Sequence, residues 1–268
     1  MGKKVPFAKG RRICPFCQGE SGSPISGEHI WPAWASDILP ERGGKHEYNI
    51  VYTEGHTKVK KVKKDYVRPG SPRGVKIRLP CKLCNETWMG AIEAEAKPYL
   101  LPLINGKWIP LTDDARVVLS RWLFLKFLVL DGEGKEVPAN TPEAYTKFRD
   151  DQTVPYDFKV WIGRTESKKW QDNYIMHSFS VRKSLTDSKR IDGRKNLNTF
   201  AIGLGSVFFF SIFYISIDAD PEFAREYLTR IWPSAGGVNL PISPIPENTV
   251  DLIADWAPIT LRSAIWLP

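Results

Sequence analysis

Hydrophobic residues recur with helical spacing in two stretches of this chain. From residue 85 onward, apolar side chains return every three or four positions, which predicts a helix that begins at Asn85 and stops before Pro98. The residues that set this spacing are Trp88, Met89, Ile92 and Ala96. A second helix is predicted over Ala115–Leu130, because the run 112–114 (Thr-Asp-Asp) supplies a cap directly before it.

Extended patterns precede the first helix. Short strands are predicted at Ser23–Ile30 and His46–Thr53. Residues 57–79 are rich in charge and predict a ribbon or hairpin, with its turn at the Pro- and Gly-containing run 69–74. Together these elements predict two strands followed by one helix in the first hundred residues.

The second half of the chain predicts strands at Tyr156–Ile162 and Tyr174–Val181, a short helix around Pro221–Ile231, and then a Pro-rich passage. Its longest apolar stretch, Phe200–Ile217, is long enough to raise the question of a membrane span. The stretch holds glycines and serines and is rich in β-branched and aromatic residues. These features favour a pair of buried strands over a transmembrane helix.

We therefore expect two parts: an N-terminal module over 10–100, and an α+β domain with an antiparallel sheet over 108–268. Net charge separates the same two parts. Residues 1–100 hold 18 of the 38 Lys and Arg and 10 of the 30 acidic residues, so this segment carries the whole net charge of +8. A basic module beside a neutral one indicates a polyanionic partner for the first part.

The N-terminal residues and the cysteine usage bear on the cellular location of the protein. The first dozen residues are basic and lack an apolar core, so they do not predict a secretory signal. Paired cysteines without a leftover cysteine are typical of a reducing compartment, where they bind metal more often than they form disulfides. We expect a cytoplasmic protein with no membrane association.

All four cysteines lie in two CxxC pairs, one on each side of a Glu-His step. The pairs are Cys14 with Cys17 and Cys81 with Cys84. Two such pairs predict a tetrahedral four-cysteine zinc site. Between them lies the run 28–32 (Glu-His-Ile-Trp-Pro), and Asn85 follows the last cysteine at once.

This order of motifs resembles the HNH endonuclease family, whose fold is the ββα-metal fold. The resemblance covers about residues 12–97, a third of the chain, and rests on Cys-x-x-Cys, Glu-His-Ile-x-Pro and Cys-x-x-Cys-Asn in the family's order. It implies an α+β protein in which a small zinc-stapled ββα-metal module precedes the mixed α+β domain. The role of 108–268 stays open between substrate specificity, oligomerisation and binding of a protein partner.

The resemblance also implies the chemistry of the module, a metal-dependent hydrolysis of DNA phosphodiester bonds. His29 would be the general base that activates water, for which an ordinary histidine pKa of about 6.5 is suitable. Glu28 and Asn85 would hold Mg²⁺ or Mn²⁺ as oxygen ligands. Asn49 is the candidate for the middle Asn that orients the histidine, and the cysteine-bound Zn²⁺ would be structural.

The insert between Asn49 and Cys81 is strongly basic, and Asp65 is its one acid after Glu54. Its candidate DNA-binding residues are Lys58, Lys60, Lys61, Lys63, Lys64, Arg68, Arg73, Lys76 and Arg78. In a regular ribbon the even-numbered members from 58 to 68 share one face and could follow a phosphate backbone. The alternative is a solvated edge strand that lysines protect from aggregation.

Other aromatic and imidazole side chains have structural explanations. Trp31, Trp34 and Trp88 are expected to pack the small core rather than to stack on bases. His46 and His56 are spare candidates for a metal or base role, although surface loop histidines are the more common explanation. His177, on a predicted strand, is expected to be a satisfied structural residue.

Two other functions stay open. A zinc-stapled DNA-binding protein without catalysis would need the cysteines but neither His29 nor Asn85. A thiol-redox protein would use the CxxC pairs as reversible disulfides, but the flanking sequence lacks the βαβ pattern of thioredoxin-like proteins.

Overall fold

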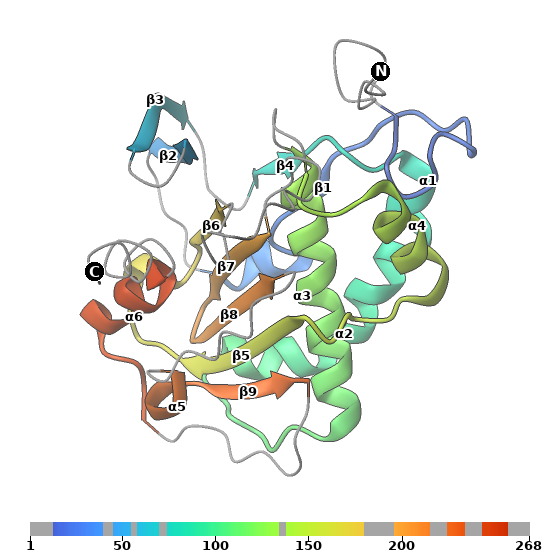
Figure 1. Ribbon diagram of the computed structural model, residues 1–268. Coiled ribbons are helices and arrows are strands. Elements are labelled where there is room, and N and C mark those ends of the chain that lie inside the picture. Colours follow the sequence, from blue (N-terminus) through green and yellow to red (C-terminus); the bar gives the residue numbers. More distant parts are fainter. Residues whose placement is uncertain are drawn as a thin grey trace, which may run out of the picture.

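The computed structural model describes residues 13–39, 45–54, 58–69, 74–133, 138–179, 196–214, 224–233 and 243–256. For 45–54 and 58–69 it describes the backbone alone. The architecture is mixed α+β: a five-stranded antiparallel sheet carries helices on both faces, and two small two-stranded sheets lie above it (Figure 1).

The main sheet has the strand order β6-β7-β8-β5-β9. Its strands are β5 (Phe158–Arg164), β6 (Tyr174–Phe179), β7 (Leu197–Leu204), β8 (Val207–Tyr214) and β9 (Thr229–Trp232). All pairings are antiparallel, and Gly205, in the left-handed region at φ 54°, makes the tight turn between β7 and β8. The predicted pair of buried strands in 200–217 is thereby confirmed.

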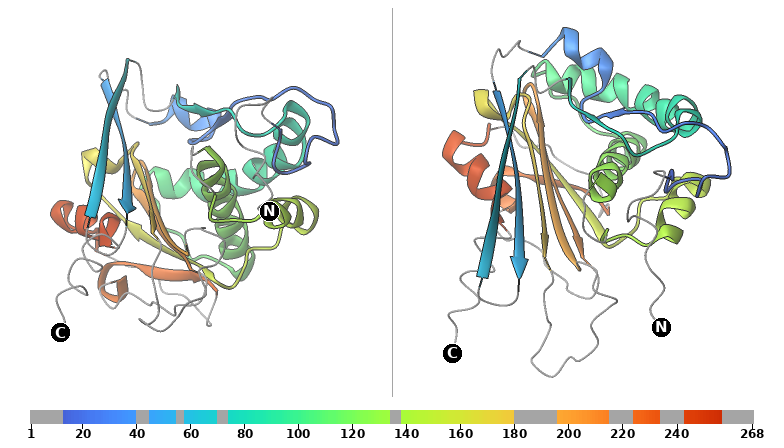
Figure 2. Two further views of the ribbon diagram at one scale, coloured as in Figure 1. Left: turned by 45° about the horizontal axis from the view of Figure 1, so that its top comes forward. Right: turned by 90° about the horizontal axis from the view of Figure 1, so that it is seen from above.

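Both faces of this sheet are buried, which explains why β7 and β8 show no alternation of apolar and polar residues. One face packs on α2 (Gly90–Ile104) and α3 (Asp113–Glu133), and the other packs on α6 (Glu247–Ala254) (Figure 2). Neighbouring residues of one strand enter different clusters: Phe209 faces α3, whereas Phe208 and Phe210 belong to the cluster with α6.

Helix α3 is confirmed over the predicted range and begins at Asp113, directly after Thr112. Thr112 Oγ1 accepts the backbone N–H of Ala115 at 3.2 Å. Helix α2, however, does not stop before Pro98 as predicted. It continues to Ile104 with Pro98 and Pro102 inside it, because its last turns bury apolar side chains in the core, and this burial outweighs the lost ladder hydrogen bonds.

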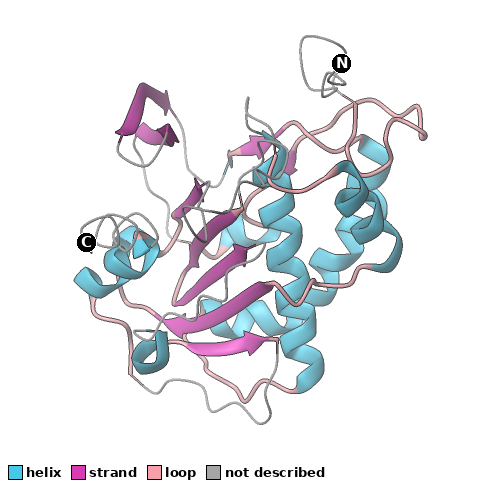
Figure 3. Ribbon diagram, viewed as in Figure 1, coloured by secondary structure: helices cyan, strands magenta, loops and turns pink. Residues whose placement is uncertain are grey.

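The remaining helices are short, and helices gather mostly on one side of the sheet (Figure 3). They are α1 (Lys82–Cys84), α4 (Pro142–Asp151) and α5 (Ala224–Tyr227), with single turns at Ala33–Asp37, Asn85–Met89 and Lys168–Trp170. The short helix predicted around Pro221–Ile231 is found as α5, but the prediction is wrong from Thr229 on. That part of the chain is strand β9, which pairs with β5.

The basic ribbon pairs differently from the prediction. Strand β3 (Lys58–Pro69) pairs with β2 (Lys45–Glu54), so the hairpin turns between these strands rather than near 69–74. The hairpin lies beside the edge strand β6 (Figure 2). The register shifts between Tyr48 and Ile50, which interrupts the regular ladder that the shared face of lysines presupposed.

The N-terminal and C-terminal segments share one hydrophobic core. A single cluster of buried residues runs from Cys14 through α2 and α3 to Ile231 on β9. Fully buried Trp31 reaches across this core, where its Nε1 donates to the carbonyl oxygen of Gly203 on β7 at 3.2 Å. The boundaries 10–100 and 108–268 stay a prediction, and the segments on either side of them pack as one body.

Among the described helices, none is both long enough and apolar enough to cross a bilayer.

Candidate active site

The four cysteines come together where the chain around Cys14 and Cys17 meets α1. Their sulfur atoms all lie within 4.8 Å of one another, all four side chains are buried, and Cys17 Sγ lies 3.7 Å from Cys81 Sγ. A tetrahedral zinc with Zn–S bonds of about 2.3 Å places its sulfurs about 3.8 Å apart. The cluster therefore fits a structural metal such as zinc, as the paired CxxC spacing predicted.

Local backbone geometry builds both halves of this cluster. Gln18 and Gly19 adopt left-handed conformations, with φ 49° and 84°, and fold the chain back directly after Cys17. On the other side, Cys81 is the N-cap of α1, and its Sγ accepts the backbone N–H of Cys84 at 3.5 Å. Each CxxC thus curls its two sulfurs toward one point.

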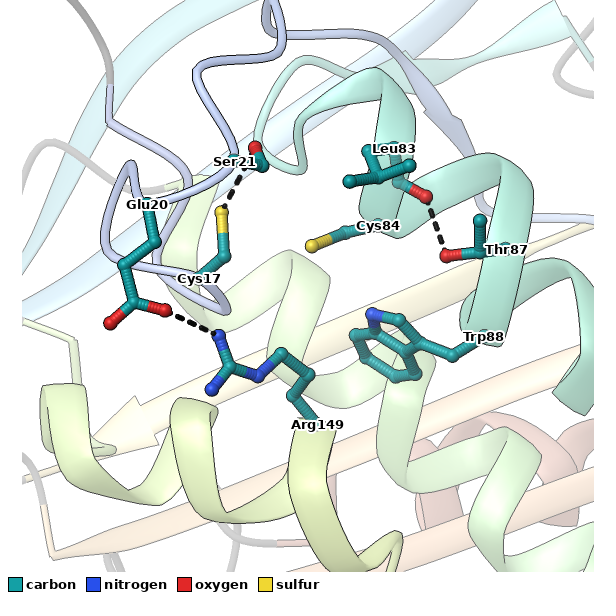
Figure 4. Close-up of a pocket in the computed structure, with 8 residues that line it drawn as sticks. All are labelled: Cys17, Glu20, Ser21, Leu83, Cys84, Thr87, Trp88 and Arg149. Atoms are coloured by element: carbon teal, nitrogen blue, oxygen red, sulfur yellow. Dashed lines mark hydrogen bonds and ion pairs between the residues drawn. The ribbon is translucent and has the colours of Figure 1, made fainter.

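Burial and hydrogen bonds shift the pKa of three of these thiols by different amounts. Burial raises the pKa of Cys14 to about 11. Burial also acts on Cys17, but the hydroxyl and backbone N–H of Ser21 and the backbone N–H of Gly19 outweigh it and lower the pKa to about 6. Burial raises the pKa of Cys84, opposed by Trp88, whose indole nitrogen points toward that sulfur (Figure 4). A bound cation would supply the charge that lets all four sulfurs act as thiolates.

A cleft of about 300 Å³ lies beside two of these cysteines (Figure 4). Its rim carries Arg149, which pairs with Glu20 at 3.2 Å. The lining residues are Cys17, Glu20, Ser21, Leu83, Cys84, Thr87, Trp88 and Arg149. None of the predicted catalytic residues belongs to this lining.

The predicted base and its neighbouring acid form a strand of their own, β1 (Glu28–His29). It pairs with β4 (Lys76–Ile77), with Glu28 opposite Ile77 and His29 opposite Lys76. Adjacent strand residues face opposite sides, so Glu28 is 5% exposed whereas His29 is half-buried. The predicted strand at 23–30 is shorter than expected.

Asn85 lies directly against this strand. Its Nδ2 donates to the hydroxyl of Ser26 at 3.1 Å and to the carbonyl oxygen of Gly27 at 3.2 Å. Gly27 is bonded to Glu28, so the fold brings together three of the predicted site residues. The described residues place no hydrogen bond on Asn85 Oδ1, which leaves that oxygen as the donor a hard cation would use.

Glu28 is held on its buried side by Lys126 of α3. The Lys126 ammonium donates to Oε1 of Glu28, to Oε1 of Glu93 on α2, and to the carbonyl oxygen of His29 at 2.8 Å. Sequence reasoning missed Lys126 and Glu93. A signal was present, because Lys126 is the one charged residue in the apolar run 122–130, where a lysine is stable only if it is paired.

Burial and charge act against one another in this cluster. Burial raises the pKa of Glu28, Lys126 opposes this rise, and Glu93 adds to it. Burial lowers the pKa of Lys126, but the two carboxylates outweigh burial and raise it. The two carboxylates that pair with Lys126 account for its tolerance in the core.

Mg²⁺ and Mn²⁺ prefer carboxylate and amide oxygens as ligands, and Glu28 and Asn85 supply one of each type. The environments of the two differ. Asn85 offers Oδ1 at a half-buried position, whereas one oxygen of Glu28 already receives the Lys126 ammonium.

Asn49 lies on β2, in a two-stranded sheet separate from that of β1 and β4, at the register shift of the hairpin. The side chain of Asn49 lies outside what the structure describes, so its role toward His29 stays a prediction. Of the other histidines, His46 lies on β2 and His56 lies outside the described residues. His177 is buried, and its Nε2 lies 3.0 Å from Asp255 Oδ1, which confirms a satisfied structural residue.

The candidate DNA-binding residues fall into two groups. Lys58, Lys60, Lys61, Lys63, Lys64 and Arg68 all lie on β3, of which the backbone is described. Lys76 lies on β4 opposite His29, and Arg78 follows it; both are exposed. Arg73 lies outside the described residues.

The three tryptophans near the site pack as predicted. Trp31 is fully buried, with its ring 5.2 Å from that of Tyr174 in an edge contact. Trp34 and Trp88 are partly buried against the same core, and Lys97 lies over the Trp34 ring at 5.4 Å.

No family model matches the chain, and neither the curated proteins nor the solved structures include a match to it.

Proposed function

We propose that this protein is a metal-dependent endonuclease of the HNH type that hydrolyses DNA phosphodiester bonds. The observation that carries the proposal is the bond from Asn85 to Gly27, which joins the start of the helix to the residue before Glu28 and His29. A scaffold alone needs neither a half-buried histidine on this strand nor an amide oxygen beside it.

In the proposed reaction, His29 accepts a proton from water, and the hydroxide attacks the phosphorus atom. The bond from phosphorus to the 3′ oxygen breaks, and the leaving oxygen takes a proton from solvent water. The products are a 5′-phosphate and a 3′-hydroxyl. A divalent metal held by Glu28 and Asn85 would supply positive charge beside the leaving oxygen. Lys76, opposite His29, and the lysines of β3 would attract the DNA backbone without reading its sequence.

The zinc site has a separate role in this proposal. Zn²⁺ on the four cysteines would hold the turn 13–21 against α1, and so fix the start of the helix that carries Asn85. The metal would be structural, because all four ligands are protein sulfurs and no position is left for water.

Plasmid DNA incubated with Mg²⁺, Mn²⁺ or EDTA tests the proposal. Wild-type protein should nick the plasmid with either metal and be inactive in EDTA. Asn85→Ala should weaken metal binding, so that cleavage needs a higher concentration of Mg²⁺ or Mn²⁺. Asn105→Ala, which removes an exposed amide bonded to Leu101, should not change this concentration. DNA retention in gel shifts without cleavage in any metal would refute the nuclease proposal and favour the non-catalytic DNA-binding protein.

A further inference from the structure

Lys126 of α3 contacts Glu28 and His29 from the interior of the molecule. Its side chain is fully buried. An ammonium group has three N–H bonds, and all three are used: two on the carboxylates of Glu28 and Glu93 and one on the backbone carbonyl of His29. One side chain of α3 thus contacts both residues of β1.

Strand β1 is held only in part by its own pairing. It is two residues long, and among the described strands it pairs with the equally short β4, with one flanking backbone bond on each side, from Ser26 to Pro80 and from Ile30 to Val75. A two-stranded ladder is marginal in water. Asn85 holds the chain where it enters β1, through Gly27. Lys126 holds the strand itself, so the direction of the Glu28 carboxylate and the path of the His29 backbone depend on α3.

A purely structural role does not explain a lysine at this position. The neighbours Leu125 and Phe127 are apolar and buried, and an apolar side chain of similar volume often serves a core as well as a buried ion pair does. What an apolar side chain cannot do is hold a carboxylate and a backbone carbonyl at fixed hydrogen-bond distances.

We propose that Lys126 is the residue that positions Glu28 and His29. Helix α3, outside the N-terminal module, thereby completes the active site. This inference rests on the proposed nuclease function. It means that the C-terminal part of the chain takes part in catalysis by setting the geometry of the base and of the carboxylate.

The variant Lys126→Met tests the proposal, because it keeps the length of the side chain and removes its charge and donors. A misplacement of about 1 Å at a reacting group can cost about 100-fold in rate. We therefore expect kcat to fall by about 30- to 100-fold while KM for DNA changes little. Arg121→Met is the matched control, since it removes another ion pair from α3 to α2, the one with Glu95, without contacting β1.

The split between kcat and KM separates positioning from a general loss of structure. Unfolding of a fraction of molecules lowers the amount of folded enzyme, which circular dichroism and zinc content reveal. Misplacement of Glu28 and His29 instead lowers kcat in molecules that stay folded.

Because Lys126→Met leaves two buried carboxylates without a cation, Lys126→Met with Glu93→Gln is the second variant, in which one acid is already neutral. Circular dichroism and zinc content establish that each variant is folded. Rates within about threefold of Arg121→Met in a folded variant would overturn the proposal. A large loss of kcat in a folded variant, with KM for DNA little changed, supports it.

A readout without DNA separates this inference from the proposed function. The chain has four histidines, and the side-chain NMR signals of His29 and His177 can be followed in one spectrum. In Lys126→Met the His29 signals should shift and broaden while those of His177, paired with Asp255, stay in place. If wild type does not cleave DNA, the nuclease proposal falls, and an unmoved His29 signal would independently overturn the role of Lys126.

Discussion

Cys81→Ser is the change that most directly tests the metal-stapled part of the fold. Cys81 is buried, and its sulfur meets three features at once: it lies 3.7 Å from Cys17 Sγ, accepts the N–H of Cys84, and lies 3.2 Å from the Ser21 hydroxyl. The substitution therefore removes one metal ligand, while the serine hydroxyl can still cap α1. Because the cysteines belong to the same core as α2 and α3, the damage should reach the whole molecule.

The size of the effect follows from the burial. Breaking a buried charge interaction by removing one partner costs about 3–5 kcal/mol. For a chain of about this length, each kcal/mol lowers the melting temperature by about 2–4 °C. A loss of about 4 kcal/mol thus predicts a drop in melting temperature of about 8–16 °C. This loss is a large fraction of the free energy of unfolding of a typical domain, about 5–15 kcal/mol.

The assay combines zinc content by elemental analysis with thermal melts followed by circular dichroism. Wild-type protein should hold one zinc per chain and melt at a lower temperature after treatment with a strong chelator. Ser21→Ala is the control, since it removes the hydroxyl beside Cys17 and Cys81 but keeps all four ligands, and should lower the melting temperature by only a few degrees. A zinc-free wild type, or a Cys81→Ser protein that melts like wild type, would refute the four-cysteine site.

Two further predictions concern the core and the hairpin. Trp31→Phe should lower the free energy of unfolding in urea by about 1–3 kcal/mol, because it removes the bond to Gly203 and part of a fully buried ring; no change would mean that the N-terminal segment is not anchored on β7. Neutralising four lysines of β3 should reduce the slope of log affinity for DNA against log salt by up to about 3.6, since each phosphate contact contributes about 0.9 to this slope. The four lysines are Lys60, Lys61, Lys63 and Lys64. An unchanged slope would make β3 a solvated strand.

The parts of the fold that depend on local pattern were predictable from the sequence. Helix α3 followed from its capping run and its length, and β7 and β8 followed from glycines and β-branched residues in an apolar stretch. The cysteine cluster followed from spacing alone, because two CxxC pairs can satisfy one tetrahedral metal only if they meet.

The parts that depend on distant contacts were not predictable. Pro98 predicted the end of a helix, but burial of Leu100, Leu103 and Ile104 carries α2 on for two more turns. The hairpin of β2 and β3 was placed with the wrong turn, because residues 55–57 carry a weaker turn signal than the Pro- and Gly-rich run that follows. Helices α4 and α6 were missed altogether.

The candidate site shows the same division. The positions of Glu28, His29 and Asn85 along the chain identified three residues that the fold brings together. Lys126 lies about a hundred residues further along the chain, and no spacing rule connects it to β1. Its unusual place in an apolar helix indicated that it needs an anionic partner, but only the packing of α3 under β1 identifies that partner.

The most direct test of the central proposal is the rate at which His29→Ala nicks plasmid DNA in Mg²⁺, compared with wild type of equal zinc content and equal DNA affinity. General-base catalysis contributes about 100- to 10,000-fold, so a loss of at least about 100-fold is predicted, with the gel shift retained. A variant that cuts at the wild-type rate would contradict the assignment of His29 as the base and, with it, the nuclease mechanism proposed for this site.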